Sequence, residues 1–344
     1  MLLVDSLYIN NSGGKVLLDY LVSELEFRNI NSYYLFDSRC CGDYKNVPLE
    51  RKSYIKAGLI NRHNFYRQNF YKFDSVFCFG NIPPTINLPT VYTYFHNISL
   101  IKYPDNYRFK ERGIKYLKKC LVKYFSKNTN YFIVQSKYVK KELCESLNIS
   151  DNSCLVIPFF KRINEESDVY VENSKNKFVY ISNGNTHKNH SKLLDAWEIL
   201  AKENIYPHLS LTITSNFILL TNRIKELQKK GLRIRNYGFT NPIDLYKNSE
   251  YIIYPSLIES FGLGLVEGVE FGCKVIASDR EYVYEVVKPT KVFDPEDPAS
   301  IADAVKYVLN NDSYMSKTII QNQIDELINV IVKNETNNTR PENR

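Results

Sequence analysis

The sequence predicts an α/β fold made of two Rossmann-like domains. Its 344 residues exceed one typical domain and suit two of about 150 to 180 residues each. Hydrophobic residues make up 44% of the chain, which is enough for two cores. In both halves an apolar run typical of a buried strand leads through a polar, glycine-containing loop into a helical stripe.

The first domain is predicted over residues 1–161. Leu2 to Val4 fits its first strand, and residues 15–25 fit a helix with an apolar stripe. The loop between them contains Gly13 and Gly14 but no full GxGxxG, so it fits a Rossmann-type loop or a tight structural turn. Further strands are predicted at 32–36, 73–79 and 130–135.

One strand of this domain ends in a histidine. Thr90 to Asn97 fits a strand that ends in His96. Parallel strands of α/β folds build sites at their carboxyl ends, so His96 is a candidate site residue. A packed or exposed histidine without a role fits the same residues.

Residues 103–127 are the most basic segment of the chain. Apolar residues at spacings of three and four predict a helix from about Arg112. Its lysines fit either a solvated face or a patch that meets anionic phospholipid or a lipid-pyrophosphate acceptor. These lysines are Lys115, Lys118, Lys119 and Lys123.

A polar stretch at 162–176 is predicted as the interdomain linker, and the second domain over 177–312. In that domain Lys188 directly precedes a predicted helix. A lysine there can neutralise a diphosphate, although a solvated loop lysine fits as well. An apolar-striped helix is predicted at 313–333, followed by a polar tail at 334–344.

The stretch from Tyr254 to Asp279 carries the strongest pattern. A buried strand precedes a polar loop, a short helix from about Leu263 to Phe271, and another strand. Glu259 lies in the loop and Glu267 on the helix. The amides of Phe261, Gly262 and Leu263 are expected in the first helical turn, where unpaired N–H groups attract phosphate. On spacing alone, the two glutamates also fit an ordinary α/β unit.

These residues resemble a known family. Glu259 and Glu267, within P-S-x-x-E-S-F-G-L-x-L-V-E-G, are similar to the E-x7-E motif of retaining glycosyltransferases of family 4. That resemblance implies the GT-B fold, in which two Rossmann-like domains face each other across a cleft. The sequence departs from the family at Gly264, where proline is frequent, and at Gly268, where alanine is frequent.

The resemblance also implies roles for individual residues. Glu259 and His96 are expected at the catalytic centre, with Glu259 orienting the donor sugar. The family places an arginine five residues before the phosphate-binding lysine, but Asn183 stands there, and His187 and Arg235 are the two candidates to replace it. The residues expected to bind the donor are Gly13, Gly14, Asn183, Lys188, Ser260, Phe261, Gly262, Leu263 and Glu267. In GT-B enzymes the terminal helix crosses back to the first domain.

Composition excludes several classes of protein. Seven cysteines without a framework spacing indicate a reducing compartment. The N-terminus lacks a signal peptide and no run reaches the ~20 apolar residues of a membrane span, so a cytoplasmic protein is expected. The net charge of +7 comes without a zinc finger, RNP motif or arginine cluster, which argues against nucleic acid.

The sequence therefore predicts a retaining hexosyltransferase that uses a nucleotide diphosphate sugar. The expected acceptor is a glycan or lipid-linked saccharide of a surface polysaccharide such as O-antigen or capsule, by analogy with the family. No cofactor or metal is expected, because no DxD pair lies in a loop. Two alternatives are a sugar-nucleotide epimerase of the same fold and a donor-binding scaffold subunit without turnover.

Overall fold

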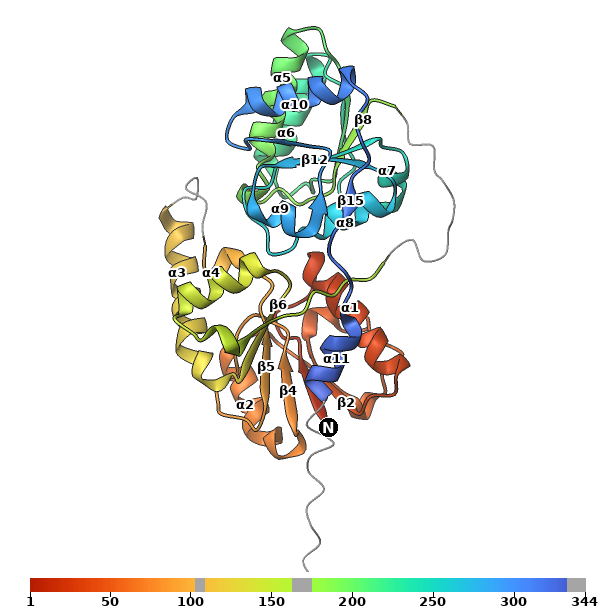
Figure 1. Cartoon of the computed structure of the whole chain (residues 1–344). Coiled ribbons are helices and arrows are strands. Elements are labelled where there is room, and N and C mark those ends of the chain that lie inside the picture. The colour runs from red at the N-terminus through yellow and green to blue at the C-terminus, as the bar shows by residue number, and fades with distance from the viewer. Residues whose placement is uncertain (103–108, 163–174, 333–344) are drawn as a thin grey trace, which may run out of the picture. The chain divides into compact units, whose positions relative to one another are not determined.

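The structure, a computed structural model, describes residues 1–102, 109–162 and 175–332. They fall into two compact units (Figure 1). Unit 1 holds the described residues of 1–161 together with 321–332, and unit 2 holds those of 162–320. The predicted tail at 334–344, and the predicted linker apart from Arg162 and residues 175–176, lie outside the described residues.

Unit 1 is built on a seven-stranded parallel sheet with the strand order β3-β2-β1-β4-β5-β6-β7. Its central strands β1, β4 and β5 are buried throughout because helices and loops cover both faces, as in α/β sheets generally. The strands are β1 (Leu2–Asp5), β2 (Ser32–Asp37), β3 (Lys52–Ile55), β4 (Ser75–Cys78), β5 (Val91–Tyr94), β6 (Tyr131–Val134) and β7 (Cys154–Val156). The helices are α1 (Ser12–Phe27), α2 (Leu59–Asn69), α3 (Phe109–Phe125), α4 (Lys137–Leu147) and α11 (Ile324–Val332).

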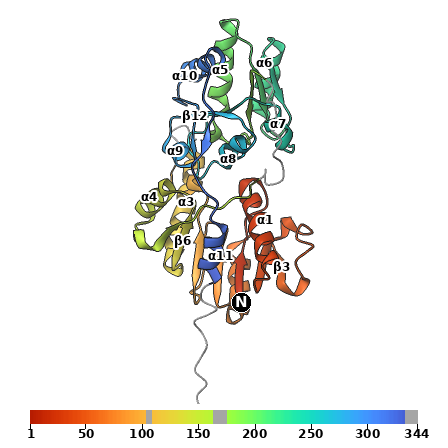
Figure 2. The same cartoon turned by 45° about the vertical axis from the view of Figure 1, so that its right-hand side comes forward.

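Unit 2 repeats this plan with a six-stranded parallel sheet in the order β10-β9-β8-β11-β12-β14. Helices α5 and α10 lie side by side against it (Figure 2). The strands are β8 (Lys177–Tyr180), β9 (His208–Leu211), β10 (Ile234–Asn236), β11 (Tyr251–Tyr254), β12 (Lys274–Ser278) and β14 (Lys291–Phe293). The helices are α5 (His190–Lys202), α6 (Ile218–Lys229), α7 (Ile243–Lys247), α8 (Leu263–Glu270), α9 (Glu281–Val286) and α10 (Pro298–Asn310).

Each sheet has one topological switch point, where the chain reverses its direction of growth across the sheet. It lies between β1 and β4 in unit 1, and between β8 and β11 in unit 2. Loops that leave neighbouring strands on either side of such a point diverge and leave a crevice at the carboxyl ends of the strands. The loops after β1 and β4, and after β8 and β11, are therefore the places to look for sites.

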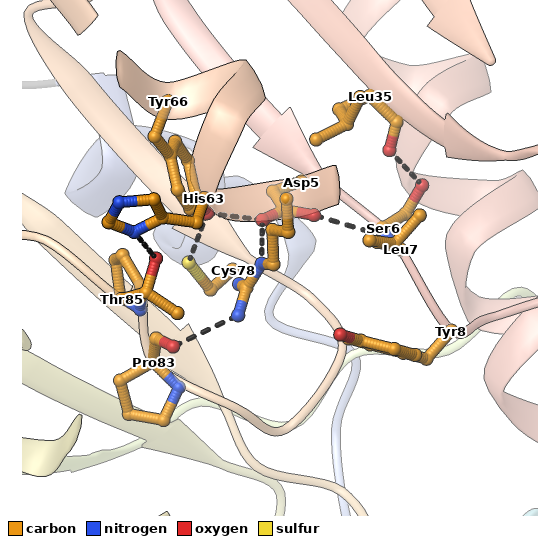
Figure 3. Close-up of polar contacts among 12 residues, drawn as sticks. Asp5, Ser6, Leu7, Tyr8, Leu35, His63, Tyr66, Cys78, Pro83 and Thr85 are labelled. Carbon is orange, nitrogen blue, oxygen red and sulfur yellow. Dashed lines mark hydrogen bonds and ion pairs between the residues drawn. The ribbon is translucent and has the colours of Figure 1, made fainter. Parts of the chain in front are cut away.

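A buried ion pair fixes the two loops at the switch point of unit 1. Arg62 of α2 donates its Nε to Asp5 Oδ2 at 2.6 Å, and each side chain is 1% exposed. Tyr66, one turn further along α2, donates its hydroxyl to the same carboxylate (Figure 3). Arg62 Nη1 also donates to the carbonyl of Pro83 at 2.9 Å. The pair thus ties the end of β1 to the loop after β4.

The helix predicted at 313–333 is wrong in its first half. Residues 313–323 are not helical. Within them, Lys317–Thr318 form a short strand, β15, antiparallel to β13 (Val287–Lys288). The backbone of this stretch bonds to the chain next to β13 instead of forming helical hydrogen bonds. Ile319 N donates to Val286 O at 2.9 Å. Strand pairing therefore overrides the helical stripe, as tertiary contacts often override propensity.

The remaining helix, α11, packs on the sheet of unit 1. It lies against β4, where Ser75 Oγ donates to the carbonyl of Ile331 at 3.2 Å. Just before it, Gln323 N donates to Pro158 O at 2.8 Å and Asn322 Nδ2 to Tyr20 Oη at 2.8 Å. Unit 1 is consequently assembled from two separate stretches of the chain.

Candidate active site

The loops on either side of the switch point of unit 2 are joined through Lys188 and Glu259. Lys188 ends a single turn of 3₁₀ helix after β8, and Glu259 lies in the loop after β11. Lys188 Nζ donates to Glu259 Oε1 at 2.6 Å, with the two side chains 16% and 11% exposed. The backbone also joins these loops, because Leu257 N donates to His187 O at 2.8 Å. Two predicted site residues, 71 positions apart in sequence, are thus in direct contact.

The pair keeps Glu259 ionised despite its burial. Burial alone would raise the pKa of Glu259, but the charges of Lys188 and His187 outweigh it and hold the pKa below its ordinary value. The Tyr254 hydroxyl adds a hydrogen bond to Oε1 at 3.3 Å. The site therefore holds a carboxylate and an ammonium group side by side at the carboxyl edge of the sheet.

Buried tyrosine and asparagine side chains hold both loops in place. The Tyr180 hydroxyl donates to the carbonyl of Lys188 at 3.1 Å and lies 2.7 Å from Ser256 Oγ. Asn189, in the left-handed conformation at φ 61°, donates its Nδ2 to the carbonyls of Pro255 at 3.1 Å and Pro295 at 2.6 Å. These bonds restrict the Lys188 backbone to one position.

Helix α8 begins beside this pair. Gly262 is its N-cap with φ 85°, a conformation that favours glycine, and Leu263 is its first residue. Of the three amides expected in the first turn, only that of Leu263 belongs to the helix, because Gly262 is the cap. Phe261, which is buried, and Ser260 precede the cap. The helix N-terminus nevertheless directs its first amides to the same edge of the sheet as Lys188.

The two glycines inside α8 are explained by packing on side chains. A Cβ at Gly264 would lie 3.3 Å from the hydroxyl of Tyr246 and 3.3 Å from a ring carbon of Tyr254. A Cβ at Gly268 would lie 3.1 Å from two carbons of Ile252. The helix therefore lies close against β11 and α7, which fixes the direction of its first turn.

Glu267 is placed on the same helix by one hydrogen bond. The Tyr246 hydroxyl donates to Glu267 Oε2 at 2.9 Å. Burial raises the pKa of this carboxyl group, against the effect of that hydrogen bond. A ligand with hydroxyl groups can donate further hydrogen bonds to such a partly buried carboxylate.

Asn183, which was predicted to bind the donor, lies in the loop after β8 and has a local role there. Asn183 Oδ1 accepts a hydrogen bond from Asn185 N at 3.1 Å and so shapes the loop after β8. Of the two residues considered as replacements for the family's arginine, His187 lies next to Lys188 and its charge acts on Glu259. Arg235 instead lies over the ring of Tyr237, with 4.7 Å between its guanidinium carbon and the ring centroid.

In unit 1 the structure brings together Gly14 and His96. Gly14 lies in the first turn of α1, and a Cβ there would be 3.1 Å from His96 Nε2. A Cβ at Gly13 would meet no other atom within 4 Å. Sequence reasoning missed Asn81, whose Oδ1 accepts from the His96 backbone N at 2.8 Å. A single asparagine in a loop carries no recognisable pattern, so no signal in the sequence pointed to it.

Comparisons with known proteins agree with the fold. Residues 162–325 match the family model described as glycosyl transferases group 1. The two Rossmann-like units are those of the GT-B fold, which solved glycosyltransferase structures share. Together these findings support a glycosyltransferase of GT-B fold.

Individual relatives are distant. The O-antigen chain mannosyltransferase RfbU of Salmonella typhimurium is 21% identical over 217 residues, covering 62% of this chain and 59% of that protein. The capsular polysaccharide biosynthesis glycosyltransferase CapH of Staphylococcus aureus is 30% identical over 156 residues, covering 41% and 42%. The matches thus span about two-fifths to three-fifths of these relatives.

Two solved structures share the fold over most of their length. Anabaena HepE in complex with UDP and glucose has a TM-score of 0.66 at 15% identity, with 90% of each chain covered. The lipopolysaccharide outer core galactosyltransferase WaaB has a TM-score of 0.63 at 17% identity, with 98% of each chain covered.

Proposed function

We propose that this protein transfers a hexose from a nucleoside diphosphate sugar to a saccharide acceptor, with retention of anomeric configuration. The observation that carries the proposal is the contact between Lys188 and Glu259 at the switch point of unit 2, beside the N-terminus of α8. A cation and helix amides suit a diphosphate, and a fixed carboxylate suits sugar hydroxyl groups.

The proposed reaction needs few protein groups. The bond between the anomeric carbon and the diphosphate breaks, and Lys188 with the first amides of α8 stabilises the charge on the leaving oxygen without a metal ion. The acceptor oxygen bonds to the anomeric carbon on the same face, and its proton passes to the departing diphosphate. Glu259 orients the donor sugar. Glu267 accepts hydrogen bonds from the ribose diol, supplementing the one from Tyr246.

The acceptor proposed is a glycan or a lipid-linked saccharide of a surface polysaccharide. The relatives that support this class are named for O-antigen and capsule synthesis. At the identities found, the name of a relative indicates a substrate class rather than a particular sugar.

A panel of UDP, GDP, dTDP and CMP sugars tests the activity. Released nucleotide is measured with and without short saccharide acceptors, and the Glu259→Gln variant serves as the inactive control. We expect release that increases with acceptor and is lost in the variant. A change of the sugar without any acceptor would show an epimerase instead. Nucleotide binding, seen as a raised melting temperature, without either product would show a donor-binding subunit.

We also propose that α3 contacts an anionic membrane. Four side chains at spacings of three and four share one face of this helix and are exposed: Ile114 at 49%, Leu117 at 65%, Leu121 at 36% and Tyr124 at 63%. The apolar stripe that would ordinarily pack on a core therefore faces solvent, with Lys118 beside it and Lys115, Lys119 and Lys123 on the other faces of the helix. An exposed apolar face on a helix whose other faces carry lysines is typical of helices that lie in a membrane interface. No helix in the described part of the chain is long and apolar enough to cross a membrane.

Liposome binding tests this contact. Each lysine near an anionic surface contributes about 1 kcal/mol, and salt weakens the attraction. Replacing Lys115, Lys118, Lys119 and Lys123 by glutamine should release the protein from phosphatidylserine liposomes, while Lys202, Lys225, Lys229 and Lys230 replaced by glutamine should not. Failure of the unaltered protein to bind at low salt would reject the proposal.

A further inference from the structure

Asn81 contacts both the backbone and the ring of His96. It follows β4, and His96 follows β5, so both lie at the carboxyl edge of the unit 1 sheet. Asn81 adopts φ 67°, a left-handed conformation that asparagine tolerates better than most residues. Its Oδ1 accepts from the His96 backbone N at 2.8 Å, and its Nδ2 lies 3.4 Å from His96 Nε2.

The two contacts together determine which ring nitrogen carries the proton. A backbone N–H can only donate, so the amide atom that faces it must be the oxygen of Asn81. The amide nitrogen then faces Nε2, and an amide nitrogen can only donate. His96 Nε2 must therefore offer its lone pair, which leaves the proton of the neutral ring on Nδ1.

The other nitrogen of the ring, Nδ1, differs from Nε2 in its surroundings. His96 Nδ1 is enclosed and makes no hydrogen bond to any of the described residues. The ring of Tyr94 stacks on the imidazole with 4.9 Å between centroids, and Gly14 closes the side of Nε2. Burial lowers the pKa of His96 to about 4, so the ring is neutral at pH 7. An enclosed N–H without an acceptor costs free energy unless a ligand supplies one.

We propose that Asn81 is a positioning residue that holds His96 in the Nδ1–H tautomer, so that the ring donates a hydrogen bond to a hydroxyl oxygen of a bound saccharide. The donation to a saccharide rests on the proposed function, whereas the tautomer does not. In this arrangement His96 acts as a neutral donor and takes no proton during the reaction. Gly14 leaves the space in which the ring keeps this orientation.

Nitrogen NMR of the whole protein tests the tautomer directly. The chain has five histidines, so labelling histidine alone with ¹⁵N gives five rings, and the His96→Asn variant assigns one of them. Long-range proton–nitrogen correlations distinguish the Nδ1–H from the Nε2–H tautomer. We expect Nδ1–H for His96 at pH 7. An Nε2–H pattern in the unaltered protein would overturn the proposal without reference to activity.

The Asn81→Asp variant reverses the pattern if the reasoning is correct. The carboxylate has nearly the shape of the amide and still accepts from the backbone, but it presents an acceptor to Nε2. The ring should then carry its proton on Nε2, and sugar transfer should fall about 10-fold, the effect of one hydrogen bond. Asn148→Asp is the matched control, since Asn148 is also left-handed at φ 57° and is exposed at the C-cap of α4. An unchanged tautomer in Asn81→Asp would overturn the role of Asn81.

Addition of ligand separates this inference from the proposed activity. UDP-glucose, UDP and methyl glucoside are each added to the labelled protein. A shift of the His96 Nδ1 proton with UDP-glucose or methyl glucoside, but not with UDP, supports donation to a saccharide hydroxyl. Binding of these probes without any shift refutes the saccharide contact. If none binds, the proposed function fails for them, but the tautomer measured in the free protein still decides the role of Asn81.

Discussion

Replacing Lys188 by methionine should destabilise unit 2 through the carboxylate that it leaves behind. Methionine keeps most of the side-chain volume and removes only the charge, so Glu259 loses its ion pair at 2.6 Å and remains 11% exposed. Breaking a buried ion pair from one side costs about 3 to 5 kcal/mol. The Tyr254 hydroxyl still donates to Glu259, and some solvent reaches both positions, so we expect a loss of about 3 kcal/mol, the lower end of that range.

A double-mutant cycle separates the ion pair from other effects of the substitution. Glu259→Gln in the Lys188→Met background removes the unpaired charge, so the double variant should lose only about 1 kcal/mol relative to the unaltered protein. Urea unfolding is followed by the fluorescence of Trp197, the only tryptophan in the chain, which is buried in α5 of unit 2. The signal therefore reports on the unit that contains the pair.

The pH dependence has a definite sign. In the unaltered protein the pKa of Glu259 is depressed, so its contribution to stability is present above the unfolded pKa and is lost as pH falls through the folded pKa. Without Lys188, burial should raise the folded pKa of Glu259. Protonation of Glu259 at low pH then removes the unpaired buried charge and reduces the loss of stability. The difference in stability between the two proteins should be largest near pH 7 and shrink toward pH 4. A double variant as unstable as Lys188→Met, or a difference independent of pH, would refute this account.

Three further predictions concern other residues. Gly14→Ala places a methyl group 3.1 Å from the neighbouring imidazole and should lower transfer about 10-fold; unchanged transfer would contradict this contact. Glu267→Ala should weaken binding of nucleoside and nucleoside diphosphate alike, by about 1 to 3 kcal/mol in calorimetry; unchanged affinity would give this residue a purely structural role. Arg62→Met leaves Asp5 buried without its partner and should cost about 3 to 5 kcal/mol in urea unfolding, and a loss below about 1 kcal/mol would contradict the burial of the pair.

Local patterns predicted the strand–loop–helix unit around Glu259 because each of its elements is encoded by neighbouring residues. The two Rossmann-like domains followed from the same patterns, and the fold is confirmed. The contact between Lys188 and Glu259 could not be predicted from spacing, since it depends on β8 and β11 being neighbours in the sheet. The functional roles of the site residues stay predictions until the variants are measured.

Two regions were missed for physical reasons. No element was predicted between residues 44 and 71, where the structure has β3 and α2. The buried face of α2 includes Arg62, so the apolar periodicity that identifies a helix is broken by a charged side chain whose partner is 57 residues away. The prediction for the residues before α11 failed for the opposite reason. The apolar stripe that includes Ile319 and Ile320 indicated a helix, but this segment pairs with a strand that is distant in sequence.

The return of the chain to unit 1 has a consequence for synthesis on the ribosome. Residues 1–161 emerge first, but the face of β4 that receives α11 is not covered until Val332 has been made. At about 5 to 20 residues per second, the intervening stretch takes roughly 10 to 30 s to translate. The described residues of unit 2 all fall within 162–320 and can fold during that time, so the domain that begins first is the one that is completed last. During that interval the apolar face beneath α11 is exposed to the chaperones that act on nascent chains.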